Sequence, residues 1–384
     1  MIYFDNSATT KPYPESVKVF SDVAGDFFGN PSSLHGLGLK SGKLLQQARQ
    51  IAANSLGVSS GELIFTSGGT ESNNSAIKGV ALAYRERGKH IITSAIEHAS
   101  VYETCKQLED LGYTVTVLPV NRKGIVSVED VKKALREDTI LVSIMQVNSE
   151  LGSIQPIGEI ASLLSHYPKV LFHVDGVQGF GKLPVMPKKW GIDLLSLSAH
   201  KFHGGRGTGL LYVRQGVKLS PLMSGGGQEQ GRRSGTENLP GIVAMARAMK
   251  IGMGNLGKNQ KHMSRLRDHL ITRLKELPYC ILNSPEVTNV EGAPQIVNFS
   301  CPGLKSEVIV HALEDYDIYV STRSACSSKN DKPSRVLLAA GMDVDRAKSA
   351  LRVSFSPENT IEEVDRFIEA VEQTVPKLAK IMRV

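Results

Sequence analysis

A lysine stands at the end of an apolar run, where its amine could attack a carbonyl group. Residues 191–201 read as a buried apolar strand that ends in polar residues and in Lys201, and a glycine-rich loop follows over residues 202–209. Partial burial favours the free amine of a lysine, and a free amine forms imines with carbonyl compounds. A lone lysine is more often a surface residue, so this interpretation depends on groups elsewhere in the chain.

Two further patterns carry groups that would complement such a lysine. The apolar run 169–175 ends in Asp175, and the strand-like run 62–67 leads through Gly69 and Thr70 into a helix. A carboxylate can keep a pyridine nitrogen protonated, so that the ring withdraws electrons. Backbone N–H groups at the start of a helix favour a phosphate. Together, the three patterns predict a site for pyridoxal phosphate.

The order of strands and helices predicts the fold class. Strand-like runs at residues 90–93, 113–118 and 139–145 alternate with amphipathic helices, one of which begins after Ser127. This alternation predicts an α/β fold with a mainly parallel sheet covered by helices on both faces. Further along the chain we expect helices over 238–277, 306–316 and 361–381, and strands over 295–300, 318–321 and 351–355.

The chain resembles the NifS/IscS-type cysteine desulfurases, pyridoxal-phosphate-dependent enzymes of the class V aminotransferase family. Motifs that carry the resemblance lie at residues 3–10, 28–35, 66–73, 96–98, 173–178, 198–201, 225–229, 233–238, 324–326 and 351–354. The resemblance implies the transferase fold type I, with a large pyridoxal-phosphate domain and a smaller α/β C-terminal domain. We expect the large domain over 14–255 and the small domain over 1–13 and 256–384.

The resemblance also implies how the cofactor ring would be held. His98 would stack on the ring and transfer protons, and Gln178 would bond the phenolic oxygen. Asn148 would lie near that oxygen and the substrate carboxylate, while Asp175 would face the ring nitrogen.

The cofactor phosphate has its own expected set of contacts. Besides Gly69 and Thr70, the resemblance assigns Ser198 and His200 to the phosphate. Thr236 would reach across a dimer interface to the partner's phosphate, which implies a homodimer.

Two residues near the end of the chain would act on the substrate. Arg352 would pair with the α-carboxylate of L-cysteine, a task that suits a planar guanidinium. Cys326 matches the family's persulfide carrier, and Arg323 and Lys329 could favour its thiolate. Arg323 departs from the family, in which a small residue is expected. The other cysteines match no motif and are predicted to be structural: Cys105, Cys280 and Cys301.

Composition excludes several other classes of protein. Charged residues make up 22% and apolar residues 41%, as in soluble globular proteins. No apolar run approaches the ~20 residues of a membrane span, and the start lacks the regions of a signal peptide. No CxxC pair occurs, and His200 and His203 have no third ligand nearby, so we expect a cytoplasmic protein without a metal.

The net charge of +7 comes with only short basic runs, at 188–189, 232–233 and 258–261. None is interleaved with aromatic residues, so we expect no direct nucleic-acid binding. A positive surface could still steer an acidic or RNA-bound partner protein.

The reaction and the sulfur acceptor leave alternatives. A transaminase or selenocysteine lyase would share Lys201 and Asp175, but a transaminase would not need Cys326. A non-enzymatic scaffold and an RNA-binding module are the non-enzyme alternatives.

For the sulfur acceptor we favour a tRNA-thiolating enzyme over an iron–sulfur scaffold. Relatives that dock a scaffold carry a longer C-terminal extension, whereas residues 377–384 form a short basic end.

Overall fold

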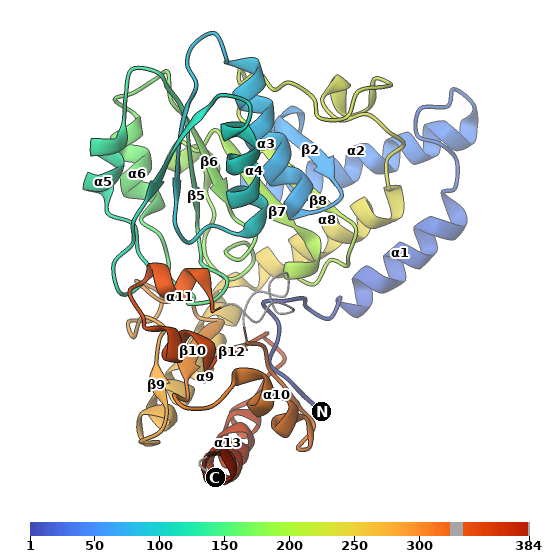
Figure 1. Cartoon of the computed structure of the whole chain (residues 1–384). Coiled ribbons are helices and arrows are strands. Elements are labelled where there is room, and N and C mark those ends of the chain that lie inside the picture. The colour runs from blue at the N-terminus through green and yellow to red at the C-terminus, as the bar shows by residue number, and fades with distance from the viewer. Residues whose placement is uncertain (323–332, 383–384) are drawn as a thin grey trace.

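The computed structural model describes residues 1–322 and 333–382, and its central feature is a seven-stranded sheet (Figure 1). The strand order is β2-β8-β7-β6-β5-β3-β4. The strands are β2 (Leu63–Thr66), β3 (His90–Ser94), β4 (Thr114–Leu118), β5 (Thr139–Met145), β6 (Leu171–Asp175), β7 (Leu194–Ser198) and β8 (Gly209–Val213). The strands from β4 to β7 pair in parallel, and β8 is antiparallel to both β7 and β2. The predicted α/β class with a mainly parallel sheet is confirmed.

Helices bury both faces of this sheet. Consecutive strand residues point to opposite faces, so Leu210 packs with one core cluster and Leu211 with another. The first cluster contains side chains of α2 (Gly36–Leu56), α5 (Val128–Ala134), α6 (Ile157–Leu164) and α8 (Leu239–Gly254). The second contains side chains of α3 (Gly69–Ala83) and α4 (Ala99–Glu109). Two more helices, α1 (Pro14–Asp26) and α7 (Pro187–Trp190), complete this part of the chain.

A smaller sheet, with strand order β12-β10-β9, lies in the lower half of Figure 1. It is antiparallel and consists of β9 (Ile281–Leu282), β10 (Ile296–Ser300) and β12 (Ala350–Ser354). Its core cluster includes side chains from α9 (Leu256–Lys275), α10 (Ser306–Glu314) and α13 (Ile361–Met382). The short helices α11 (Arg335–Ala339) and α12 (Val344–Lys348) lie between β11 (Ile318–Tyr319) and β12. No helix in the described ranges is both long and apolar enough to cross a bilayer.

Two local expectations from the sequence need correction. The helical stretch expected over 238–277 is two helices, because Asn255 leaves the helical conformation with φ −110° and ψ 7°. This break lies where the sequence placed the change of domain, but the domain boundaries themselves remain a prediction. Ser127 occupies the N-cap position of α5 as expected, yet its side chain makes no capping hydrogen bond.

The N-terminal arm connects the smaller core with the carboxyl end of β7 in the large sheet. Its strand β1 (Ile2–Tyr3) pairs in parallel with β11. Phe4 is fully buried, and its ring meets those of Phe355 and Phe367 edge-on at centroid distances of 5.3 and 5.9 Å. Further along, the Thr10 amide donates to the His200 carbonyl at 2.8 Å. The arm is therefore anchored in one core and ends beside Lys201.

Replacing Phe4 with alanine should loosen this anchor. Removing a fully buried phenyl ring costs about 3–5 kcal/mol, through lost transfer free energy and the cavity left behind. We expect Phe4→Ala to lower the free energy of unfolding in urea by that amount. Leu111→Ala is the control, because Leu111 is 63% exposed and its loss should change the free energy by less than about 0.5 kcal/mol. Equal stabilities of the two variants would contradict the anchoring role.

Candidate active site

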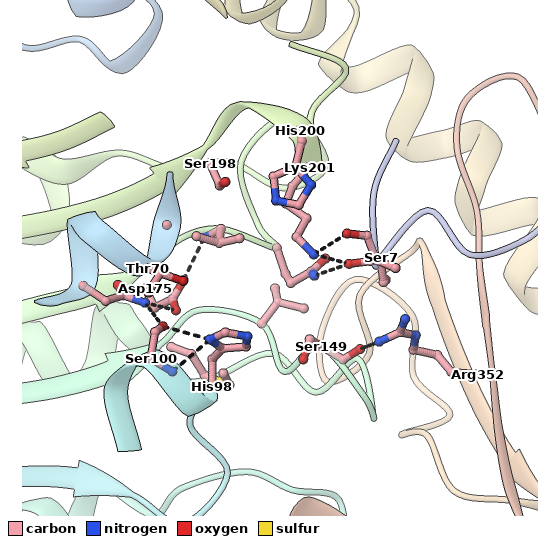
Figure 2. Close-up of a pocket in the computed structure, with 17 residues that line it drawn as sticks. Ser7, Thr70, His98, Ser100, Ser149, Asp175, Ser198, His200, Lys201 and Arg352 are labelled. Atoms are coloured by element: carbon pink, nitrogen blue, oxygen red, sulfur yellow. Dashed lines mark hydrogen bonds between the residues drawn. The ribbon is translucent and has the colours of Figure 1, made fainter. Parts of the chain in front are cut away.

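A cavity lies at the carboxyl ends of the parallel strands, where α/β sheets commonly bind ligands (Figure 2). Nine residues singled out from the sequence line it: Gly69, Thr70, His98, Asp175, Gln178, Ser198, His200, Lys201 and Arg352. Asn148 and Thr236 are not among the lining residues, and Cys326 lies outside the described part of the chain. The fold therefore brings together residues that the sequence separates by most of its length.

Lys201 follows β7 in a short 3₁₀ turn, Ala199–Lys201, and its amine points toward the N-terminal arm (Figure 2). The Nζ atom donates hydrogen bonds to the carbonyl oxygens of Ser7 at 2.5 Å and Ala8 at 2.8 Å. Burial, aided by the charge of Lys201, lowers the pKa of the adjacent His200 to about 4. Near neutral pH, His200 is therefore uncharged and does not compete with Lys201 for an anionic partner.

A chain of hydrogen bonds joins Asp175 to His98. Asn73 donates from Nδ2 to Asp175 Oδ2 at 2.8 Å and to Ser100 Oγ at 2.9 Å. The Ser100 hydroxyl lies 2.8 Å from His98 Nδ1, which also accepts the Ser100 amide proton at 3.1 Å. Because Nδ1 is an acceptor, the neutral ring carries its own proton on Nε2. Burial is the main cause of the lowered pKa of His98, and the charge of Lys201 adds to it.

Asn73 and Ser100 also line the cavity, although neither was predicted as a site residue. A signal for Asn73 was available, since it lies four residues after Gly69 and so on the same face of α3. Ser100 had no comparable signal, because a serine in the first turn of a helix is ordinarily a capping residue.

The start of α3 has the geometry that an anion requires. A Cβ atom added to Gly69 would lie 2.9 Å from Val177 Cγ2 and 3.4 Å from Ser198 Cβ, so only a glycine lets these segments approach. Gly68 is the N-cap residue and offers no side chain to the first N–H groups of the helix. The backbone N–H groups of Gly69 and Thr70 therefore suit a phosphate, with Ser198 beside them.

Arg352 lies across the cavity from Asp175 and is only 1% exposed. Its Nη1 donates to the Ser149 carbonyl at 2.9 Å and its Nη2 to Asp5 Oδ1 at 2.8 Å. Within the described residues its buried Nε has no hydrogen-bond partner. A buried, incompletely paired guanidinium suits a substrate carboxylate.

The two ring-contact candidates, Gln178 and Asn148, differ in their surroundings. Gln178 lines the cavity and donates from Nε2 to the Ser7 carbonyl at 2.9 Å. Asn148 is fully buried, donates to the Ile96 carbonyl at 3.0 Å, and accepts from the amides of Glu150 and Leu151 at 2.9 and 2.8 Å. The Asn148 side chain thus shapes the turn over residues 148–152, which contains Ser149, a hydrogen-bond partner of Arg352. Its contact with a ligand remains a prediction.

The remaining candidates lie away from this cavity. Thr236 lines a second cavity, together with Thr66, Ser67 and Arg233. Burial raises the pKa of Cys105 to about 12, and the sulfur atoms of Cys280 and Cys301 lie 3.7 Å apart near the smaller core. Over residues 1–322 and 333–382, no cluster of three or more His, Cys, Asp or Glu side chains could hold a metal ion.

Glu97, which directly precedes His98 in the chain, has a buried carboxyl group. Its Oε1 accepts from Ser94 Oγ at 2.6 Å and from the Met145 amide at 3.1 Å. Burial raises the pKa of Glu97 to about 8, despite these two donors, and the charge of Asp175 adds to the rise. At pH 7 this side chain is therefore mostly protonated, so it adds little negative charge beside Asp175.

The raised pKa of Glu97 makes stability depend on pH. The folded protein binds a proton that the unfolded chain releases above its ordinary pKa of 4.5, so stability falls as the pH rises from about 4.5 to about 8. We expect Glu97→Gln, which is neutral at every pH, to flatten this decline. Melting temperatures of both proteins between pH 5 and pH 8 check the prediction. Parallel declines of the two curves would contradict a protonated Glu97.

Comparisons with known proteins show the family to which the chain is similar. The class-V aminotransferase family profile matches residues 2–367. A NifS/IcsS protein homolog from Lactobacillus delbrueckii subsp. bulgaricus is 48% identical over 99% of both chains. The cysteine desulfurase IscS of Methanosarcina thermophila is 44% identical over 98% of this chain and 92% of its own. A solved NifS-like protein superposes with a TM-score of 0.92 at 40% identity, over 98% of this chain and 99% of its own.

The fold and the cavity define an enzyme of the pyridoxal-phosphate-dependent class V aminotransferase type. Within that class, the chain belongs to the NifS/IscS cysteine desulfurases. The resemblance drawn from the sequence and the cofactor inferred from it are thereby confirmed.

Proposed function

We propose that the enzyme converts L-cysteine to L-alanine, holds the released sulfur as a persulfide on Cys326 and passes it to an acceptor protein. One observation carries the assignment of the site: Lys201, Asp175, His98 and Arg352 converge on a single cavity from four separate segments. Each of these side chains has a role in removing sulfur from an amino acid.

When bound, pyridoxal phosphate withdraws electrons from the substrate Cα, which weakens the Cα–H bond and allows the C–S bond to break. The chain supplies the remaining parts. Arg352 binds the α-carboxylate and fixes the orientation of the amino acid. Lys201 takes the proton from Cα and later returns a proton to Cα of the alanine product. Asp175, buried at the end of β6, would face the ring nitrogen of the bound cofactor.

Sulfur transfer requires a nucleophile besides Lys201. The thiolate of Cys326 attacks the substrate sulfur, the C–S bond breaks, and a new S–S bond leaves a persulfide on the enzyme. The electron pair of the C–S bond stays on the substrate carbon, which takes up one proton in place of the proton that Cys326 loses. The transferred sulfur keeps the proton of the substrate thiol, so the products are alanine and a neutral persulfide. His98 is placed to move protons in this step, since it lines the cavity with Nε2 bearing the ring proton.

Two variants separate the roles of Lys201 and Cys326. We expect Lys201→Ala to abolish alanine production, because no amine remains to move the Cα proton; general acid–base groups contribute roughly 10²–10⁴-fold. Cys326→Ser should still bind L-cysteine at the cofactor, seen as a spectral change, but accumulate no persulfide. Mass spectrometry of the protein after L-cysteine addition is the measurement. Persulfide on Cys105, Cys280 or Cys301 would contradict the choice of thiol.

A homodimer is part of the proposal. Thr236 lies in a cavity apart from Lys201, which is compatible with its serving the partner's phosphate. The segment from α1 to the start of α2 also exposes large apolar side chains that a second copy could cover. They are Val17, Phe20, Phe28, Leu34, Leu37 and Leu39, with Leu34 91% exposed.

We further propose a tRNA-thiolating enzyme as the sulfur acceptor, and the cytoplasm as the location. The net charge of +7 supports association with an acidic or RNA-bound partner, because long-range attraction raises the encounter rate. The free thiols Cys105, Cys280 and Cys301 suit a reducing compartment.

A labelled-sulfur transfer assay against both acceptor classes tests this choice. We expect faster transfer from the loaded enzyme to a thiouridine synthetase than to an iron–sulfur scaffold. The advantage should shrink as salt rises, since the Debye length falls from about 10 Å at 0.1 M to about 3 Å at 1 M. Efficient transfer to the scaffold alone would overturn the acceptor and leave the desulfurase assignment intact.

A further inference from the structure

The loop that carries Thr236 also contacts the strand leading into the phosphate-binding turn. Within residues 223–238, buried Glu229 accepts hydrogen bonds from Arg49, at 2.9 Å from Nη1 and 2.5 Å from Nη2, and from the Phe65 amide at 3.0 Å. Glu229 has a φ of 48°, a conformation that residues with side chains rarely adopt. The bidentate pair with Arg49 holds this loop against β2, directly before the turn.

The same loop also forms an ion pair with α3, the helix that follows the turn. Arg233 donates from Nε to Glu71 Oε1 at 2.8 Å and from Nη2 to Oε2 at 3.4 Å. The two side chains are 23% and 14% exposed. Glu71 Oε2 also accepts from the Ser67 amide at 2.8 Å. Burial opposes ionisation of Glu71, but the hydrogen bonds from Arg233 and Ser67 prevail and lower its pKa, so it is a carboxylate at neutral pH.

The position of Glu71 creates an electrostatic conflict. It lies in the first turn of α3, next to Thr70, where the helix dipole amounts to roughly half a positive charge. A full negative charge there outweighs the dipole and repels the phosphate that Gly69 and Thr70 are proposed to bind. A guanidinium paired with that carboxylate removes the repulsion, because the pair carries no net charge.

We propose that Arg233 is a positioning residue for the cofactor phosphate, which cancels the charge of Glu71 beside Thr70. The inference rests on the proposed phosphate-binding role of Gly69 and Thr70. It deepens that role, because it makes cofactor affinity depend on a side chain that does not line the cavity containing Lys201. Thr236 follows Arg233 by only three residues in the same loop. The ion pair therefore also restricts the position of Thr236.

Titration of the cofactor-free protein with pyridoxal phosphate tests this inference without any activity measurement. We expect Arg233→Gln to raise the dissociation constant about tenfold or more, because unpaired like charges at the edge of a buried site repel each other strongly. Adding Glu71→Gln to that variant should restore the constant to within about threefold, since the repelling charge is gone. Glu71→Gln alone should bind at least as tightly as the wild-type protein.

Two controls separate charge from general disruption. Pyridoxal lacks the phosphate charge that Glu71 would repel, so its affinity should change by less than about threefold in every variant. Arg85→Gln removes an exposed ion pair with Glu86 and should leave both affinities unchanged.

Four outcomes would overturn the proposal. These are wild-type affinity in Arg233→Gln, failure of the double variant to recover, and equal losses for pyridoxal and its phosphate. The fourth is equal affinity of the wild-type protein for pyridoxal and for pyridoxal phosphate. That result would show that the phosphate adds nothing to binding, so the proposed phosphate site itself would be wrong. If Arg233→Gln does not fold, Glu71→Gln alone decides, since tenfold weaker binding by that variant contradicts a repelling carboxylate.

Discussion

The pair of hydrogen bonds from Lys201 to the N-terminal arm is the contact on which the site depends. The amine donates to the carbonyls of Ser7 and Ala8, at 2.5 and 2.8 Å. The same arm holds Arg352 through Asp5 at 2.8 Å and is anchored in the smaller core by Phe4. One short segment therefore contacts both Lys201 of the large sheet and Arg352 of β12, the residues proposed for cofactor chemistry and for substrate binding.

Burial gives this cavity a simple charge pattern. It lowers the pKa values of His98 and His200 and raises that of Glu97, so all three favour their uncharged forms at neutral pH. The uncharged forms of these three groups leave less competing charge around Asp175, Arg352 and Lys201, the residues with proposed roles in the reaction. Fewer competing charges in a low-dielectric site make each remaining interaction stronger. The ion pair of Arg233 and Glu71 applies the same rule to the phosphate end.

Much of this arrangement could be predicted from the sequence, because strand ends and helix starts leave plain signals. Apolar runs that end in Asp175 or lead to Lys201 place both at the same edge of a parallel sheet, and glycines before a helix mark the phosphate turn. Hydrogen-bond geometry leaves no such signal. Asn148 has the residue type of a ligand contact, yet its side chain satisfies backbone groups, and Asn73 takes the central place between Asp175 and Ser100. The break at Asn255 was predicted in part: the sequence placed the change of domain there, but it also predicted one continuous helix over 238–277.

Identifying the lysine that bonds to pyridoxal phosphate is the measurement that tests the proposed site most directly. Lys182 is the strongest competitor: its Nζ donates to the Lys201 carbonyl at 2.5 Å, and burial lowers its pKa to about 7, with a contribution from the charge of Lys201. A fraction of Lys182 amines is thus unprotonated at neutral pH. Reduction of the cofactor-loaded enzyme with borohydride, followed by peptide mapping, locates the bond. The account predicts the cofactor's mass on Lys201 alone, and its appearance on Lys182 or another lysine would contradict it.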